Sequence, residues 1–149
     1  AACYRLGALY GWSDLVFTSD KKEIEKYRLL RGDVLFNRTN SPALVGKTAL
    51  YDEERPAIYA GYLIRVKCSP RLLPGYLVYC LNSPSGRDYC WRVKSDGVSQ
   101  SNINAQKLAA FEFLLPTLTE QAEIHPDDGP DGETKAHQVR AGHDAKAPL

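Results

Sequence analysis

The sequence predicts an α+β fold, in which a single domain holds a curved, mostly antiparallel sheet flanked by short helices. Short runs rich in β-branched and aromatic residues alternate irregularly with short helical runs, rather than in strict strand–helix order. The segments between neighbouring strand candidates have the length of hairpin connections, which favours antiparallel pairing. A chain of 149 residues, 44% of them hydrophobic, also suits one core.

One helix and three strands are expected before residue 70. The helix covers 21–31, where Ser19 or Asp20 can cap the first turn and Gly32 ends the last one. Its predicted apolar stripe consists of Ile24, Tyr27 and Leu30. The predicted strands are 33–38, 45–51 and 57–68, with a turn at 39–42.

Helices dominate the prediction after residue 70. Pro74 is placed at the first turn of a helix that runs to Cys80 or Leu81, and Ser83-Pro84 can start another over 85–94. The remaining expected elements are a turn at Asp96-Gly97, a short helix at 104–110, a strand at 111–115 and the beginning of a helix at 118–124. Residues 125–149 contain three Pro, three Gly and few large apolar groups, so we expect a disordered acidic tail there.

The cysteine pattern argues against a disulfide framework or a zinc site. The four cysteines, Cys3, Cys68, Cys80 and Cys90, form no C-x-x-C pair and have no histidine at zinc-ligand spacing. We expect free buried thiols in a reducing compartment and no metal. No apolar run is long enough to span a bilayer. The chain opens on Ala-Ala-Cys rather than Met, which favours a piece of a longer protein or a trimmed chain.

The net charge of +1 hides an asymmetry along the chain. Residues 1–118 hold 16 Lys and Arg against 11 Asp and Glu, whereas residues 119–149 hold 3 against 7. The body of the chain is therefore basic and the tail acidic. A basic body attracts polyanions such as nucleic acid, although many unrelated domains share this property.

One stretch resembles a phosphate-binding loop but departs from it in two ways. Residues 41–48 read Ser-Pro-Ala-Leu-Val-Gly-Lys-Thr and match G-x-x-x-x-G-K-[ST] except at Ser41. Pro42 also lacks one of the backbone N–H donors that such a loop needs, and a strand rather than a helix is predicted next. We therefore do not expect an NTPase, and no other catalytic constellation is evident because the three histidines all lie in the polar tail.

Three segments combine small polar side chains with Arg or Lys. They are 37–40 (NRTN), 87–94, in which Tyr89 and Trp91 interleave with basic residues, and 99–104 (SQSNIN). Arg can read guanine, and Asn or Gln can read adenine, while Lys, Ser and Thr mostly contact phosphates. Each segment also has a structural interpretation. The first can be a satisfied turn, Tyr89 and Trp91 can belong to the core, and the third can cap the 104–110 helix.

Several of these stretches, in this order along the chain, carry a resemblance to a known family. They are 32–42 (GDVLFNRTNSP), 44–49 (LVGKTA), 99–104, and 111–113 (FEF) leading to 116–121 (PTLTEQ). Over about residues 10–124 the chain resembles the target-recognition domain of the specificity subunit of type I restriction–modification enzymes. The resemblance implies a DNA target-recognition domain at 1–117 and the start of a spacer helix at 118–124, followed by the tail at 125–149.

The resemblance also implies a division of labour. Such a subunit carries two recognition domains that each read half of a split DNA site, while separate methylation (M) and restriction (R) subunits act with S-adenosylmethionine and with ATP and magnesium. This chain would bind double-stranded DNA in the cytoplasm, need no cofactor of its own and catalyse nothing. Its other partners would be the M and R subunits and a second recognition domain or half-subunit. Where the family continues in a long helix, this chain turns at His125 into its tail, so the spacer is expected to be truncated.

Chemistry and position within these segments give a set of candidate DNA contacts. We expect Arg38, Asn40 and Gln100 to reach bases and the lysines to reach phosphates. The full set is Arg38, Thr39, Asn40, Lys47, Arg87, Arg92, Lys94, Gln100 and Asn102. The alternatives are a protein-interaction module or inactive remnant with a non-specific basic face, and a nucleotide-binding enzyme built on 46–48.

Overall fold

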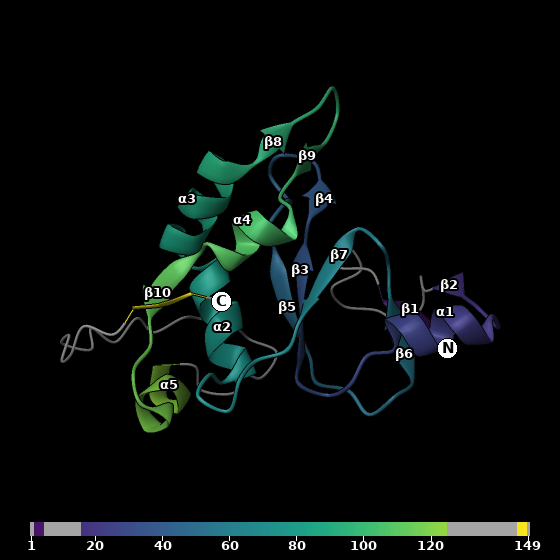
Figure 1. Ribbon diagram of the computed structural model, residues 1–149, viewed down its shortest axis with the longest axis horizontal. Helices are drawn as coiled ribbons and strands as arrows, with labels where there is room; N and C mark the ends of the chain where they lie inside the picture. Colours follow the sequence, from purple (N-terminus) through teal and green to yellow (C-terminus); the bar gives the residue numbers. More distant parts are fainter. Residues whose placement is uncertain (1, 5–15, 125–145, 149) are drawn as a thin grey trace.

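The computed structural model describes residues 2–4, 16–124 and 146–148. Its centre is a three-stranded antiparallel sheet in the order β5-β3-β7 (Figure 1). The strands are β3 (Asp33–Asn37), β5 (Thr48–Tyr51) and β7 (Leu63–Val66). Every residue of β3 is buried, because β3 is the central strand and hydrophobic clusters cover both faces of the sheet.

The other described strands form three small sheets. One has the order β4-β9-β8, from Thr39–Asn40, Ser101–Asn102 and Ser95–Asp96, and is antiparallel throughout. Another has the order β2-β1-β6, from Val16–Phe17, Ala2–Tyr4 and Ala57–Tyr59, in which β1 and β6 run parallel. The last pairs β10 (Glu112–Leu114) antiparallel with β11 (Lys146–Pro148). The α+β prediction with mostly antiparallel pairing is confirmed, but its single sheet is divided into four.

Five helices accompany these sheets in the described part of the chain. They are α1 (Lys21–Tyr27), α2 (Pro74–Asn82), α3 (Pro84–Val93), α4 (Ala105–Ala109) and α5 (Leu118–Ile124). Ser83 accepts a hydrogen bond from the N–H of Gly86 and so caps α3, while Asn104 caps α4 through the N–H of Lys107. The predictions for 74–81, 85–94, 104–110, 111–115 and 118–124 are confirmed.

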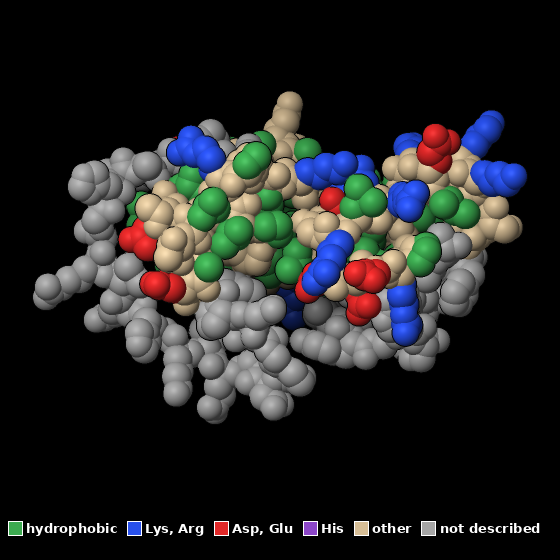
Figure 2. Space-filling view, turned by 90° about the horizontal axis from the view of Figure 1, so that it is seen from below, with side chains coloured by type: hydrophobic (Ala, Val, Ile, Leu, Met, Phe, Trp, Pro, Cys, Tyr) green, Lys and Arg blue, Asp and Glu red, His purple; other side chains and the backbone are tan. Residues whose placement is uncertain are grey.

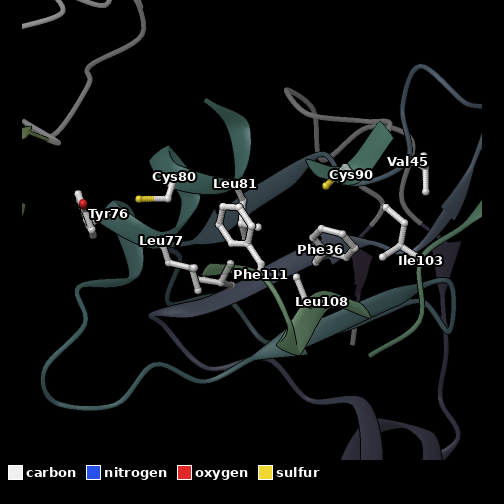
Figure 3. Close-up of a cluster of buried hydrophobic side chains, with 11 residues drawn as sticks. Phe36, Val45, Tyr76, Leu77, Cys80, Leu81, Cys90, Ile103, Leu108 and Phe111 are labelled. Atoms are coloured by element: carbon white, nitrogen blue, oxygen red, sulfur yellow. The ribbon is translucent and has the colours of Figure 1, made fainter. Parts of the chain in front are cut away.

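The core lies on both faces of the central sheet, because successive side chains of a strand point to opposite sides. Val34 and Phe36 face the larger cluster, to which α2, α3 and α4 contribute Leu77, Cys90 and Leu108, respectively (Figure 3). The side chain between them, Leu35, belongs to a second cluster on the other face, formed with Leu29, Tyr51, Ala57 and Leu63. The strand β3 therefore contributes side chains to both hydrophobic clusters.

The helix predicted at 21–31 ends four residues early. Asp20 caps it as expected, but Arg28 has extended backbone angles and forms a bridge with Ile58. The chain after Tyr27 is consequently extended, so Leu29 is buried and Leu30, predicted for the apolar stripe, is 50% exposed. Gly32 does not end the helix. Its φ of 91° instead shapes the turn that leads into β3.

Two strand predictions and one turn prediction were also wrong in detail. The strand expected at 45–51 begins at Thr48, because the residues before it form a turn. The strand expected at 57–68 is divided into β6 and β7 by a turn, in which Leu63 N–H donates to the carbonyl of Ala60. Conversely, the turn expected at 39–42 contains β4, since Thr39 and Asn40 pair with β9.

Some predictions fall outside the described residues. The tail expected at 125–149 lies there except for 146–148, which form β11. Cys3 has no described side chain, whereas Cys68, Cys80 and Cys90 are free thiols, the last two buried. Burial raises the pKa of the Cys68 and Cys80 thiols to about 11, so both are protonated at neutral pH.

Candidate nucleic-acid interface

The stretch that resembles a phosphate-binding loop folds as a tight turn leading into β5. The backbone N–H groups of residues 44–47 donate to carbonyl oxygens of the chain itself, over 2.7–3.2 Å. The next N–H, that of Thr48, donates to the side chain of Asn82 at 3.0 Å. A phosphate would need these donors, and all of them are already used.

Arg87 and Gly46 hold this turn against α3. The Arg87 guanidinium donates to the carbonyl oxygens of Val45 and Ala43, at 2.9 and 3.1 Å. Gly46 has a φ of 82°, and a Cβ at this position would lie 2.6 Å from Sγ of Cys90. The Nη1 and Nη2 groups of Arg87 thus already donate to backbone carbonyls. These hydrogen bonds fix the shape of the turn.

The sheet β4-β9-β8 brings the polar segments of the sequence together. Thr39 and Asn40 lie opposite Asn102 and Ser101, and the same two residues of β9 lie opposite β8. The amide of Asn102 donates to the hydroxyl of Thr39 at 2.7 Å. Segments that are about sixty residues apart in sequence therefore form one surface, next to the C-terminal end of α3 (Figure 1).

Lys94 and Asp96 connect α3 to the β8–β9 hairpin. The Lys94 ammonium lies 2.5 Å from Oδ2 of Asp96 and 4.2 Å from the centre of the Trp91 ring, and the Lys94 side chain is only 8% exposed. The hydrogen bond from Lys94, followed by that from Ser101, lowers the pKa of Asp96 below its ordinary value. Lys94 is therefore committed to an internal ion pair.

Three of the predicted contact residues keep their side chains unpaired. Arg38, Lys47 and Gln100 form no side-chain hydrogen bond or ion pair within the part of the chain that the structure describes. Asn40 uses its amide oxygen to accept from the N–H of Ser41, which leaves its NH₂ group available. Arg92 pairs with Asp88 at 3.0 Å, in an exposed ion pair that contributes little to stability.

The two aromatic residues of α3 have different environments. The Tyr89 hydroxyl donates to the carbonyl of Lys107, and its ring lies 5.2 Å from that of Phe111, so the expected core position is confirmed for Tyr89. For Trp91 it is wrong, because this side chain is 59% exposed. Helical spacing explains the difference, since residues two apart on a helix point in different directions.

Val98, at the tip of the β8–β9 hairpin, is not among the contact residues predicted from the sequence. This tip projects beyond the neighbouring elements at the top of Figure 1, and the N–H of Gly97 donates to the carbonyl of Gln100 at its base, 2.7 Å away. Val98 is fully exposed. A valine between the turn-forming residues Gly97 and Ser99 was the available signal, because turn tips are usually polar.

The opposite end of the molecule has a different character. Figure 2, which views the structure from below, shows hydrophobic side chains gathered over the part near α5, and basic and acidic side chains interspersed elsewhere. No three His, Cys, Asp or Glu side chains come together as metal ligands among the residues described. None of the described helices is both long and apolar enough to cross a membrane.

Comparison with known proteins gives a consistent group of relatives. No family model matches the chain. A putative type I restriction enzyme MjaX specificity subunit from Methanocaldococcus jannaschii is 32% identical over 106 residues, and the type I restriction enzyme StySPI specificity subunit from Salmonella potsdam is 34% identical over 108. The EcoKI specificity subunit from Escherichia coli K12 is 31% identical over 107 residues.

Each match covers 70% of this chain but only 23–25% of the relative. The chain thus spans about a quarter of the length of these curated proteins. The agreement of three relatives from different organisms confirms the resemblance found in the sequence motifs. The matched part of this chain is therefore a relative of part of the type I restriction enzyme specificity subunits.

Proposed function

We propose that this chain is a DNA target-recognition domain that reads one half of a split site and has no catalytic role. The observation that supports this most directly is the sheet β4-β9-β8. It joins the polar segments 37–40 and 99–104 and includes the projecting β8–β9 hairpin. Among the residues that the structure describes, the side chains of Arg38 and Gln100 have no partner. Readout of bases requires such groups on a rigid scaffold, free to exchange water for base edges.

We assign base contacts to Arg38, Asn40 and Gln100, and a phosphate contact to Lys47. Arg92 can add a phosphate contact, because its pairing with Asp88 is exposed and easily exchanged. The other candidates have positioning roles in this proposal, since their polar groups already bind within the chain. They are Thr39, Arg87, Lys94 and Asn102.

The proposal extends to the whole assembly and to the limits of the domain. It places the recognition domain at 1–117 and the start of a spacer helix at 118–124, in a cytoplasmic type I restriction–modification complex. In that complex the M and R subunits perform methylation and cleavage, and a second recognition domain or half-subunit reads the other half-site. The similarity of the chain to specificity subunits of type I restriction enzymes supports this assembly.

Selection from a randomised DNA duplex library tests the proposed function. The 149-residue chain is incubated with the library at low and then at moderate salt, and bound duplexes are sequenced. Enrichment of a short motif that persists as the salt concentration rises is the expected result. Binding without enrichment that disappears with salt, both alone and with an M subunit present, would leave a non-specific basic face instead.

A matched pair of lysine variants tests where DNA lies. The carbonyl of Lys47 accepts from the N–H of Asn37, so Lys47 lies at the end of β3 from which the chain enters β4. Lys67 follows β7, whose antiparallel pairing with β3 brings it to the other end of the sheet. We expect Lys47→Ala to weaken all DNA sequences alike and to reduce the slope of log K against log salt by about 1. Lys67→Ala removes the same charge and should leave the slope unchanged.

A further inference from the structure

Val98 is an apolar side chain that the fold presents entirely to solvent. It is fully exposed, and the residues on both sides of it, Gly97 and Ser99, are small. A single exposed valine is unremarkable on a flat surface. At the tip of a projecting hairpin, however, it would be the first group to meet anything that the hairpin enters (Figure 1).

The hairpin that carries Val98 is held rigidly at its base. Lys107 donates from its ammonium to the carbonyl of Val93 and to the hydroxyl of Ser95, at 2.6 and 2.7 Å. Asp96 accepts from Lys94 and from Ser101. These contacts link both strands of the hairpin to α3 and α4, so little conformational entropy remains to be lost when the tip binds a partner.

We propose that Val98 is a specificity-determining residue that packs against the C5-methyl group of a thymine in the major groove. This proposal rests on the function proposed above. It adds one specific contact, between the Val98 side chain and the methyl group of one thymine. The thymine methyl is the apolar group that base edges display in the major groove, and an apolar side chain distinguishes it from the bare C5 position of cytosine.

The shape and chemistry of the hairpin favour the major groove. That groove admits a two-stranded β-ribbon, and β8 and β9 form such a ribbon. Proteins that read the minor groove insert Arg or Lys, or wedge a larger side chain between base pairs. The tip, 97–100, contains neither a basic residue nor a large wedge. Its polar side chains, Ser99 and Gln100, suit hydrogen bonds to the edges of neighbouring bases.

A double-variant cycle tests this contact. It removes the thymine methyl group from the DNA and truncates the Val98 side chain of the protein to alanine. Each thymine of the selected duplex, on either strand, is replaced in turn by deoxyuridine, which lacks only the methyl group. Binding constants are measured for the unmodified chain and for Val98→Ala. Val98 makes no contact that folding requires, so the variant is expected to fold, and its circular dichroism spectrum verifies this.

We expect one thymine at which deoxyuridine weakens binding of the unmodified chain about fourfold, the effect of leaving one methyl unburied. For Val98→Ala this penalty should disappear at the same position. Leu114→Ala serves as the control, because Leu114 is also an exposed apolar residue, at 53%, but belongs to β10, away from the hairpin. This control should keep the fourfold penalty.

The remaining outcomes distinguish a failure of the Val98 contact from a failure of the proposed DNA-recognition function. An equal penalty in the unmodified chain and in Val98→Ala, or no penalty at any thymine, would overturn the assignment of Val98 while leaving specific DNA binding intact. A selected motif without thymine would do the same. Failure to select any motif would overturn the proposed function and the Val98 contact together.

Discussion

Asn82 and Thr48 are joined by a pair of hydrogen bonds across 34 residues of sequence. The N–H of Thr48 donates to Oδ1 of Asn82 at 3.0 Å, and Nδ2 of Asn82 donates to the carbonyl of Thr48 at 2.7 Å. The amide thus satisfies both backbone groups at the first residue of β5, as a neighbouring strand would. It also joins the end of α2 to the sheet.

Replacement of Asn82 should therefore destabilise the fold. We expect Asn82→Ala to lower the free energy of unfolding by about 1–3 kcal/mol, because both Thr48 groups lose their partner. Asn82→Asp keeps an acceptor for the Thr48 N–H and should lose less. Urea denaturation of the three chains measures both effects, and equal stability of Asn82→Ala and the unmodified chain would contradict this role.

The turn that precedes β5 should not bind nucleotides. Because the N–H groups of 44–47 already donate within the chain, we expect ATP or GTP with magnesium to leave the melting temperature unchanged. A concentration-dependent rise of the melting temperature would instead favour the nucleotide-binding alternative. A specific DNA duplex should raise it in the same assay.

Gln121 is a buried polar residue that joins α5 to the segment before α2. Its amide donates to the carbonyls of Arg71 and Pro116, both at 2.9 Å, and accepts from the N–H of Leu73 at 2.8 Å. Gln121→Leu would leave all three backbone groups unpaired, so we expect a loss of about 3 kcal/mol in the free energy of unfolding.

Gln106 on α4 provides the matched control for this substitution. It is exposed, and a leucine there should change stability by less than about 0.5 kcal/mol. Thermal and urea unfolding of the two variants give the comparison. Similar losses for Gln106→Leu and Gln121→Leu would show that the added apolar side chain, rather than the missing amide contacts, is responsible.

Gly46 is expected to tolerate no side chain. A positive φ disfavours L-residues, and a Cβ here would meet Cys90 at 2.6 Å, so Gly46→Ala should cost about 2 kcal/mol or more. Gly61→Ala is the control, since a Cβ at Gly61 meets no atom within 4 Å. If both variants unfold at the same urea concentration, the contact between the turn and α3 is not a tight one.

The stability of the base of the β8–β9 hairpin should depend on pH only in the acidic range. The folded protein lowers the pKa of Asp96 from 3.8, chiefly through the hydrogen bond from Lys94. The stabilisation from this carboxylate is therefore complete above 3.8 and is lost as the pH falls through the lowered value.

An NMR titration of the Asp96 carboxyl carbon, followed together with the Gly97 amide, measures this dependence. We expect unchanged signals at pH 5 and a common midpoint below 3.8. In Asp96→Asn the Gly97 amide should show no such transition. A midpoint at or above 3.8 would mean that Lys94 and Asp96 do not pair in solution.

The elements predicted most accurately are those with strong local signals. Pro74 and Ser83 mark the starts of α2 and α3, and the apolar run after Gly32 marks β3, because capping, proline geometry and β-propensity act over a few residues. Breaks within strands were missed, as at 60–61, because they depend on how strands pair across the sheet.

The sequence by itself determined the fold class, the similarity to specificity subunits and the segments that form the candidate interface. Only the tertiary structure decided which side chains in those segments remain available. Arg38 and Arg87 are equivalent in a sequence pattern, yet Arg87 donates to carbonyls more than forty residues away and Arg38 has no described partner. The availability of a charged group depends on neighbours brought to it by folding, and the exposure of Val98 depends likewise on how the hairpin projects.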